Sequence, residues 1–308
     1  MANSWSELAG KLASLAGKWT AYTAFGSFLL YLVGYLTLRF QLSTYGVVTD
    51  LDAFDEKYLF AGSRFLVYFV ASVPNVLLIM MVALAVAYLP YRLVPASAKA
   101  RLTEWGAAWM APPERVALLG TALTLAMIQF VLRKCFVFGN LLLAPHLPED
   151  EWINAILLGN PADRSLYFSG LVGGTLLTGG VLLLAVRPGV RTTTLSKMLA
   201  SLLVFLVAVE FLLLPVNYGI LIASQDLPRV SELGDAKLAA GDQNWLVWEG
   251  KAAVTYLGRV ARDGRRSLIT IPRKEPRITI VAYDNIFRAL FAPPQPGATQ
   301  VAPRGGSP

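Results

Sequence analysis

The sequence predicts an all-α polytopic membrane protein, with about five transmembrane helices plus interfacial helices and a small C-terminal β-rich extramembrane domain. Three observations support this fold class. The chain of 308 residues is 55% hydrophobic and only 15% charged, whereas soluble domains carry about 25% charged residues. Five long apolar runs follow one another between residues 20 and 223. Beyond Gln225 the apolar runs become short and are separated by turn residues, a pattern typical of strands.

Residues 1–19 are expected to form an amphipathic helix that lies on the membrane surface. Ser4 and Glu7 have the spacing of a capping box. Large apolar residues then recur at steps of three and four: Trp5, Leu8, Leu12, Leu15 and Trp19. A second interfacial helix is expected between the second and third apolar runs, with Ser97 as its candidate cap. The residues that share its apolar face are Leu102, Trp105 and Trp109.

The five apolar runs form the predicted transmembrane domain, residues 20–223, because each can cross a hydrocarbon core of about 30 Å. The predicted spans are residues 20–38, 65–89, 116–138, 167–186 and 198–223. The third run is unusual because it stays apolar beyond Arg133 and Lys134. A cation in the membrane costs about 2.5–3.5 kcal/mol on insertion scales. We therefore expect these two side chains to face partner helices, a wet cavity or the headgroups.

Other polar residues inside the predicted spans are candidate sites. Pro74 and Pro215 are expected to kink their helices, since proline removes a backbone hydrogen bond. Asn75 either bonds a neighbouring helix or lines a path for an ion or substrate. Asn217, which follows Pro215 after Val216, is a further polar candidate. Glu210 is the one carboxylate in its span, and we expect it to pair with Arg133.

The fourth apolar run is rich in glycine. Gly170, Gly174 and Thr178 follow the small-xxx-small pattern, which lets two helix backbones approach closely. The pattern predicts a tight helix–helix seam. A flexible, gating helix is the alternative interpretation.

Two charged segments flank the spans. The acidic loop between the first two spans contains Asp50, Asp52, Asp55 and Glu56. Because it lacks the glycine and the terminal glutamate of an EF-hand, we interpret it as a solvated loop or a surface helix, with a cation site as the alternative. The C-terminal domain carries a basic set: Arg262, Arg265, Arg266, Arg273, Lys274 and Arg277. A solvated face is the simpler interpretation, and contact with anionic headgroups or an acidic partner is the other.

Residues 224–292 are expected to form the β-rich domain, and the Pro/Gly-rich residues 293–308 a disordered tail. Residues 227–243 are interpreted as a polar loop. Four strands are predicted at 245–249, 253–260, 267–271 and 277–282, with a hairpin at Asp263–Gly264. Asp284 is the candidate cap of a short closing helix, residues 285–291.

The distribution of Lys and Arg predicts the orientation of the chain. With five spans, the two ends lie on opposite sides of the membrane. The side that holds the N-terminus carries about nine cationic residues against about four on the other. We therefore expect an N-terminus in the cytoplasm and a β domain outside, as in a protein of the bacterial inner membrane.

The sequence carries no phosphate-binding loop, no zinc-protease motif and no nucleophile elbow. With one His and one Cys, an ordinary zinc site is excluded, and no metal or cofactor is expected. Our first hypothesis is a non-catalytic subunit or scaffold of a membrane complex, whose partners are the lipid bilayer and other membrane subunits or further copies of itself. The alternative is a channel or transporter with a polar path near Asn75, Arg133 and Glu210. No nucleic-acid partner is expected.

Overall fold

The computed structural model describes residues 2–47, 56–138, 156, 160–187, 193–221, 226–233, 236–237, 242–250, 253–260, 265–272 and 278–291, some of them by their backbone only. The protein is mostly helical, with five long apolar helices and a small antiparallel sheet. The chain divides into two compact units. The helical unit comprises Met1–Arg39, Asp50–Val131 and Ser165–Gly219, and the sheet unit comprises Phe40–Thr49, Leu132–Arg164 and Ile220–Pro308.

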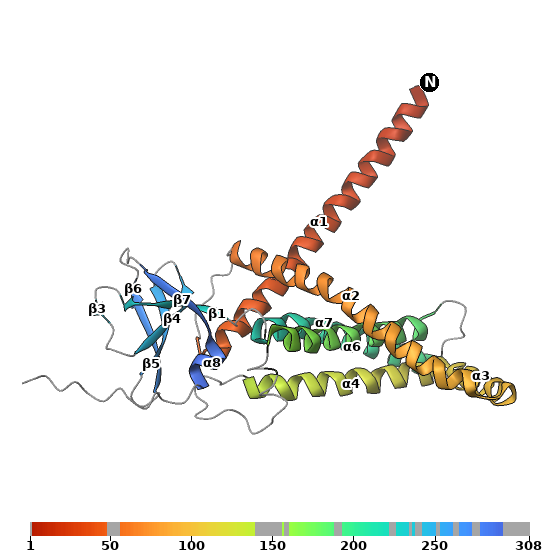
Figure 1. Cartoon of the computed structure of the whole chain (residues 1–308). Coiled ribbons are helices and arrows are strands. Elements are labelled where there is room, and N and C mark those ends of the chain that lie inside the picture. Colours follow the sequence, from red (N-terminus) through yellow and green to blue (C-terminus); the bar gives the residue numbers. More distant parts are fainter. Residues whose placement is uncertain are drawn as a thin grey trace, which may run out of the picture. The chain divides into compact units, whose positions relative to one another are not determined.

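Five helices in the described chain are long and apolar enough to cross a membrane. They are α1 (Ala2–Thr44), α2 (Glu56–Leu93), α4 (Pro113–Phe138), α6 (Pro161–Ala185) and α7 (Thr194–Leu221). A shorter helix, α3 (Ala96–Met110), joins α2 to α4 and has no buried residue (Figure 1). The hydropathy of the sequence predicted all five of these long helices, because a long apolar run is the signal for a membrane span.

The helices extend beyond the predicted spans. α1 runs without a break for 43 residues, so no boundary separates residues 1–19 from the first span, and their place on the membrane surface stays a prediction. α2 begins at Glu56, in the segment predicted to be a solvated loop or a surface helix and well before residue 65, where the second span was predicted to start. α3 begins after Pro95, which makes no side-chain cap, whereas Ser97 was predicted as the cap. Backbone hydrogen bonding continues into polar flanks that hydropathy does not detect.

Three glycines allow backbones in the helical unit to approach closely. A Cβ at Gly34 of α1 would overlap the backbone of Tyr58 in α2, and a Cβ at Gly62 of α2 would overlap that of Leu30. A Cβ at Gly219 of α7 would overlap the backbone of Thr37. These contacts join α1 to both α2 and α7. Small residues let helix backbones approach this closely.

Aromatic rings join α2, α6 and α7. Phe65 of α2 lies edge-on to Tyr218 of α7 at 5.5 Å between centroids, and to Phe168 of α6 at 6.3 Å. Tyr68 completes the cluster, 5.2 Å from each of the same two rings. Edge-to-face pairs of this kind contribute about 0.5–1.5 kcal/mol each beyond their buried area. The cluster therefore fixes the three helices against one another.

A second core joins α4, α6 and α7. Its buried members are Val116, Ala117, Ala185 and Leu203. Gly120 of α4 packs beneath the Leu203 side chain, where a Cβ would lie 2.7 Å from a methyl group. The predicted third span is therefore integrated into the helical unit through its first half.

The sheet unit contains one five-stranded antiparallel sheet in the order β6-β5-β4-β1-β7 (Figure 1). Its strands are β1 (Asp226–Val230), β4 (Gln243–Glu249), β5 (Ala253–Arg259), β6 (Arg266–Pro272) and β7 (Ile280–Asn285). A separate pair consists of β2 (Glu232–Leu233) and β3 (Ala236–Lys237). The helix α8 (Ile286–Phe291) follows β7. Val230, Val254 and Tyr256 form a buried cluster on this sheet.

The four predicted strands correspond to β4, β5, β6 and β7, but two predictions about this unit were wrong. Residues 227–243 were interpreted as a loop, yet they contain β1, which lies between β4 and β7. Pro228 obscured this strand, because proline argues against a central strand. Asn285, not Asp284, caps α8 by accepting a hydrogen bond from the Arg288 amide at 3.1 Å. Asp284 instead accepts one from the Trp245 indole at 3.1 Å and pairs with Arg229 at 3.3 Å.

Candidate functional site

The most unusual polar group in the helical unit is the Glu210 carboxyl of α7, which is only 2% exposed. Two hydroxyls of α6 contact it. The Thr178 hydroxyl donates to Oε2 at 2.9 Å, and the Thr175 hydroxyl donates to Oε1 at 3.2 Å. The two threonines are three residues apart, so they lie one above the other on the same face of α6. We call Glu210, Thr175 and Thr178 the carboxyl cluster.

Each threonine of this cluster also has a backbone acceptor within reach. Thr175 Oγ1 lies 3.1 Å from the Leu171 carbonyl, and Thr178 Oγ1 lies 3.0 Å from the Thr175 carbonyl. A hydroxyl has one proton and two lone pairs. When Glu210 is ionised, both hydroxyl protons can go to the carboxylate. When Glu210 is protonated, its own O–H can go to a threonine oxygen whose proton turns to the backbone. Both protonation states therefore keep their hydrogen bonds without any movement of the helices.

Within the helical unit, the hydrogen bonds that Glu210 accepts come from the Thr175 and Thr178 hydroxyls. The Arg133 side chain is exposed, and only the backbone of Lys134 is described, within α4. The predicted pairing of Glu210 with Arg133 stays a prediction, because Glu210 belongs to the helical unit and Arg133 to the sheet unit. Thr175 was not singled out by the sequence. The available signal was its spacing of three residues from Thr178, on a predicted span that neighbours the span with Glu210.

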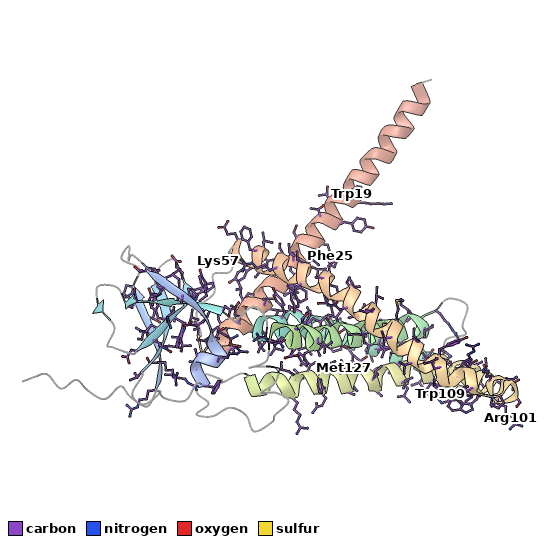
Figure 2. The ribbon with its side chains drawn as sticks, in the orientation of Figure 1. Trp19, Phe25, Lys57, Arg101, Trp109 and Met127 are labelled. Atoms are coloured by element: carbon purple, nitrogen blue, oxygen red, sulfur yellow. The ribbon has the colours of Figure 1, made fainter. Side chains whose placement is uncertain are left out.

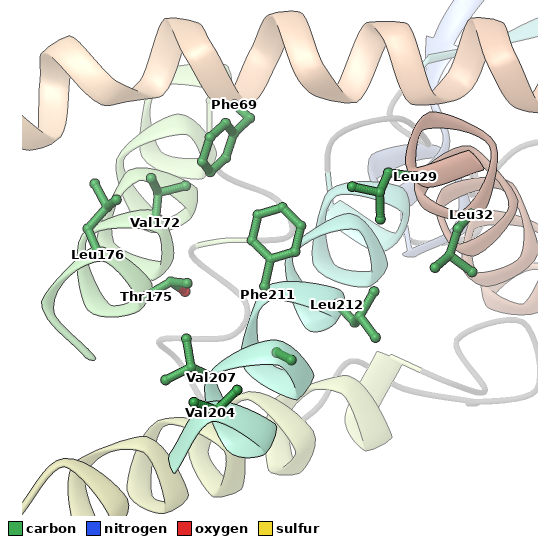
Figure 3. Close-up of a pocket in the computed structure, with 11 residues that line it drawn as sticks. Leu29, Leu32, Phe69, Val172, Thr175, Leu176, Val204, Val207, Phe211 and Leu212 are labelled. Atoms are coloured by element: carbon green, nitrogen blue, oxygen red, sulfur yellow. The ribbon is translucent and has the colours of Figure 1, made fainter. Parts of the chain in front are cut away.

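An apolar pocket of about 570 Å³ lies beside the carboxyl cluster (Figure 3). Four helices line it: Leu29 and Leu32 come from α1, and Phe69 comes from α2. The α6 and α7 residues are Val172, Thr175, Leu176, Val204, Val207, Ala208, Phe211 and Leu212. Thr175 has the one polar side chain among these eleven, and Figure 3 shows its oxygen beside the Val172 and Leu176 side chains. Thr175 therefore belongs to both the pocket and the carboxyl cluster.

The two predicted proline kinks have different surroundings. Pro215 lies inside α7, and its carbonyl accepts a hydrogen bond from Thr37 of α1 at 3.4 Å. Asn217 is buried and donates to the Leu213 carbonyl at 2.9 Å. In α2, Pro74 lies inside the helix, and the Asn75 amide that follows it is exposed. Asn217 therefore bonds the backbone of its own helix, whereas Asn75 faces outward.

The residues of the predicted glycine seam do not share one surface. A Cβ at Gly170 would meet nothing within 4 Å, whereas a Cβ at Gly174 would overlap the Met127 side chain of α4. Thr178 bonds Glu210. The predicted seam is therefore divided among open surface, a side-chain contact and the carboxyl cluster. The four-residue spacing of Gly170, Gly174 and Thr178 places them on one face of α6. The neighbouring helices contact that face at different positions along its length, so no single helix packs on all three residues.

Much of the charged sequence lies outside the described residues. This applies to Asp50, Asp52 and Asp55 of the acidic loop, whereas Glu56 is the exposed first residue of α2. In the basic set it applies to Arg262, Arg273, Lys274 and Arg277. Among the residues that the structure describes, no group of three or more His, Cys, Asp or Glu side chains could hold a metal ion.

Arg266 is part of a helix contact, not of an open basic surface. It donates to the Leu290 carbonyl at 2.9 Å, and its guanidinium lies 4.5 Å from the centroid of the Phe291 ring. Arg259, its register partner on β5, donates to the Ala289 carbonyl at 2.7 Å. Burial, with the nearby Arg259 charge, lowers the pKa of Arg266. Arg265, next to it in the chain, is exposed.

Comparisons with protein families, with curated proteins and with solved structures found no match to this chain.

Proposed function

We propose that this chain is an integral membrane protein in which α1, α2, α4, α6 and α7 cross the bilayer, with a cytoplasmic N-terminus and the sheet unit outside. The mean hydropathy of the five helices, from 1.4 to 2.6, supports this placement. Only 11–39% of each apolar window is buried within the chain, so large apolar faces point outward. In water such faces would drive aggregation. In the hydrocarbon core of a bilayer, lipid chains solvate these apolar faces.

Within the membrane we propose that the chain acts as a non-catalytic subunit or scaffold of a membrane complex. The observation that carries this proposal is the outward-facing Asn75 amide. From Leu77 to Leu93 every side chain of α2 is exposed, and Asn75 stands at the start of this surface. An amide that faces hydrocarbon has no water to bond. Amide side chains therefore commonly bond across to another transmembrane helix.

The test of this role replaces Asn75 by leucine. A hydrogen bond between helices contributes about 0.6–2 kcal/mol, so Asn75→Leu should weaken association about 3- to 30-fold. The readout is the amount of partner, or of second copy, that remains bound after purification of the full-length protein in mild detergent. Asn75→Gln keeps an amide and should retain partial binding.

The matched control is Leu78→Ala, another exposed position of α2, which should change binding little. An Asn75→Leu protein that keeps all its partners, or a wild-type protein that purifies as a monomer, would refute the scaffold role.

Proton-coupled transport is the second candidate, and the carboxyl cluster favours it. Its hydrogen bonding is complete whether Glu210 is ionised or protonated, as expected of a group that binds and releases a proton. Buried carboxyls in spans also commonly belong to proton pathways. Liposomes that contain the purified protein should then take up protons, and Glu210→Gln should abolish the uptake. Uptake that is equal in both proteins, or absent from both, would exclude this role.

A further inference from the structure

The pocket between α1, α2, α6 and α7 is the strongest unexplained feature of the helical unit. At about 570 Å³ it falls within the range of about 300–1,000 Å³ that is usual for small-molecule sites. Its lining residues in α1, α6 and α7 lie near the middle of the candidate spans Lys18–Thr44, Ala162–Ala185 and Thr194–Leu221. The pocket therefore opens at the depth of the hydrocarbon core, and this placement rests on the proposed membrane embedding.

We propose that this pocket binds one acyl chain of a membrane lipid. Ten of its eleven lining side chains are wholly apolar, so water gains too few hydrogen bonds to remain there. The single hydroxyl, that of Thr175, already has Glu210 and the Leu171 carbonyl within hydrogen-bond distance. The walls thus offer a hydrocarbon chain dispersion contacts. They offer a headgroup little to recognise.

The size of the pocket favours a thin chain over a helix of another protein. A helix with its side chains is about 10–12 Å across, so a volume of about 570 Å³ holds only about one helical turn. A transmembrane helix would have to lie across the opening and leave most of the pocket empty. A flexible acyl chain can enter from the bilayer and fill it, while its headgroup stays at the membrane surface.

The Phe69 and Phe211 side chains make one wall of the site. Their rings lie 6.3 Å apart in an edge-to-face arrangement, and Figure 3 shows both among the aliphatic side chains of the pocket. They join α2 to α7 directly. A bound chain would therefore contact all four lining helices, and its removal would leave a cavity among them.

The experiment uses the full-length protein in bilayer nanodiscs of phosphatidylcholine. A fraction of this lipid carries a photoactivatable diazirine on its acyl chain. After illumination, mass spectrometry maps the labelled residues. We expect labelling of Leu176, Val204 and Phe211 on the order of tenfold above that of Leu183 and Leu184, which are exposed on α6 outside the pocket.

Ala208→Trp is the variant that fills the pocket, because Ala208 is an exposed lining residue and its replacement deletes no packing group. It should reduce the excess labelling about tenfold. Ala85→Trp, the same change at an exposed α2 position outside the lining, should leave the excess intact. Native mass spectrometry of the detergent-purified protein gives a second readout, with one tightly retained lipid in the wild type and none in Ala208→Trp.

Uniform labelling of all exposed apolar positions would overturn the acyl-chain site while leaving the membrane embedding in place. The absence of label from every position, Leu183 and Leu184 included, would overturn the embedding itself. Protection of the pocket together with cross-links to a second polypeptide would assign it to a protein partner and refute the lipid.

Discussion

At the scale of single residues, the carboxyl cluster is held by two hydroxyls in a nearly inaccessible place. Burying a polar group costs free energy unless it is hydrogen-bonded. Glu210 therefore depends on Thr175 and Thr178 for its hydrogen bonds. The cost of a substitution in the cluster follows from the polar atoms that it leaves without a hydrogen-bond partner.

We expect Thr178→Val to lower the free energy of unfolding by about 1–3 kcal/mol, because it leaves a buried carboxyl oxygen without its donor. Glu210→Leu in the same protein removes that oxygen, so the double variant should recover a substantial part of the loss. Thermal unfolding of the four proteins in one detergent measures this coupling. Purely additive losses would show that the contact does not stabilise the fold.

At the scale of elements, α8 depends on the strands beside it. A six-residue helix is marginal by itself. Arg259 and Arg266 donate to the carbonyls of Ala289 and Leu290, the groups that a helix C-terminus leaves without partners. Cations are also favourable at that end of a helix.

Arg266→Met keeps much of the apolar stem but removes the guanidinium. It should destabilise α8 by about 1–2 kcal/mol, which corresponds to about tenfold faster hydrogen exchange at residues 286–291 of the full-length protein. Arg265→Met is the matched control, since that side chain is exposed. Equal exchange in both variants would mean that Arg266 does not hold the helix.

The glycine contacts between helices give a second prediction at this scale. Gly219→Ala should lower the thermal midpoint strongly, because its Cβ would overlap the Thr37 backbone, which cannot rotate away. Gly26 of α1 has open space around it, so Gly26→Ala should be neutral or stabilising by up to about 1 kcal/mol through helix propensity. The measurement is the thermal unfolding midpoint of each variant, compared with that of the wild type. A harmless Gly219→Ala would contradict the close approach of α1 and α7.

At the scale of the whole molecule, the proposed orientation puts α3 and the sheet unit on opposite sides of the membrane. Because α3 joins the end of α2 to the start of α4, both of its ends are anchored on one face. Its Trp105 side chain is exposed, and Figure 2 shows Arg101 and Trp109 on the same helix. Tryptophan and arginine are common where a helix meets a membrane surface.

Cysteine accessibility tests this orientation. In a Cys135→Ser background, a cysteine at Ser267 of β6 should react with a membrane-impermeant maleimide on intact cells. One at Ser97 of α3 should react only after permeabilisation. Both positions are exposed in the fold, so a difference between them reports the side of the membrane. The reverse pattern would invert the topology, and equal labelling of intact cells would refute the opposite-side placement.

The sequence by itself determined the five apolar helices and four of the five strands of the main sheet. The length of an apolar run and the presence of turn residues are local properties, because both depend only on residues that are adjacent in the sequence. The positions of Pro74, Pro215 and Glu210 within those helices were also evident from the sequence.

The tertiary structure decided which side chains meet. It gave Glu210 two threonine partners, assigned the close helix contacts to Gly34, Gly62 and Gly219, and inserted β1 between β4 and β7. These outcomes depend on helix rotation and strand order. Both are set by the fit of many side chains at once, and depth along a single helix does not reveal which faces turn toward each other.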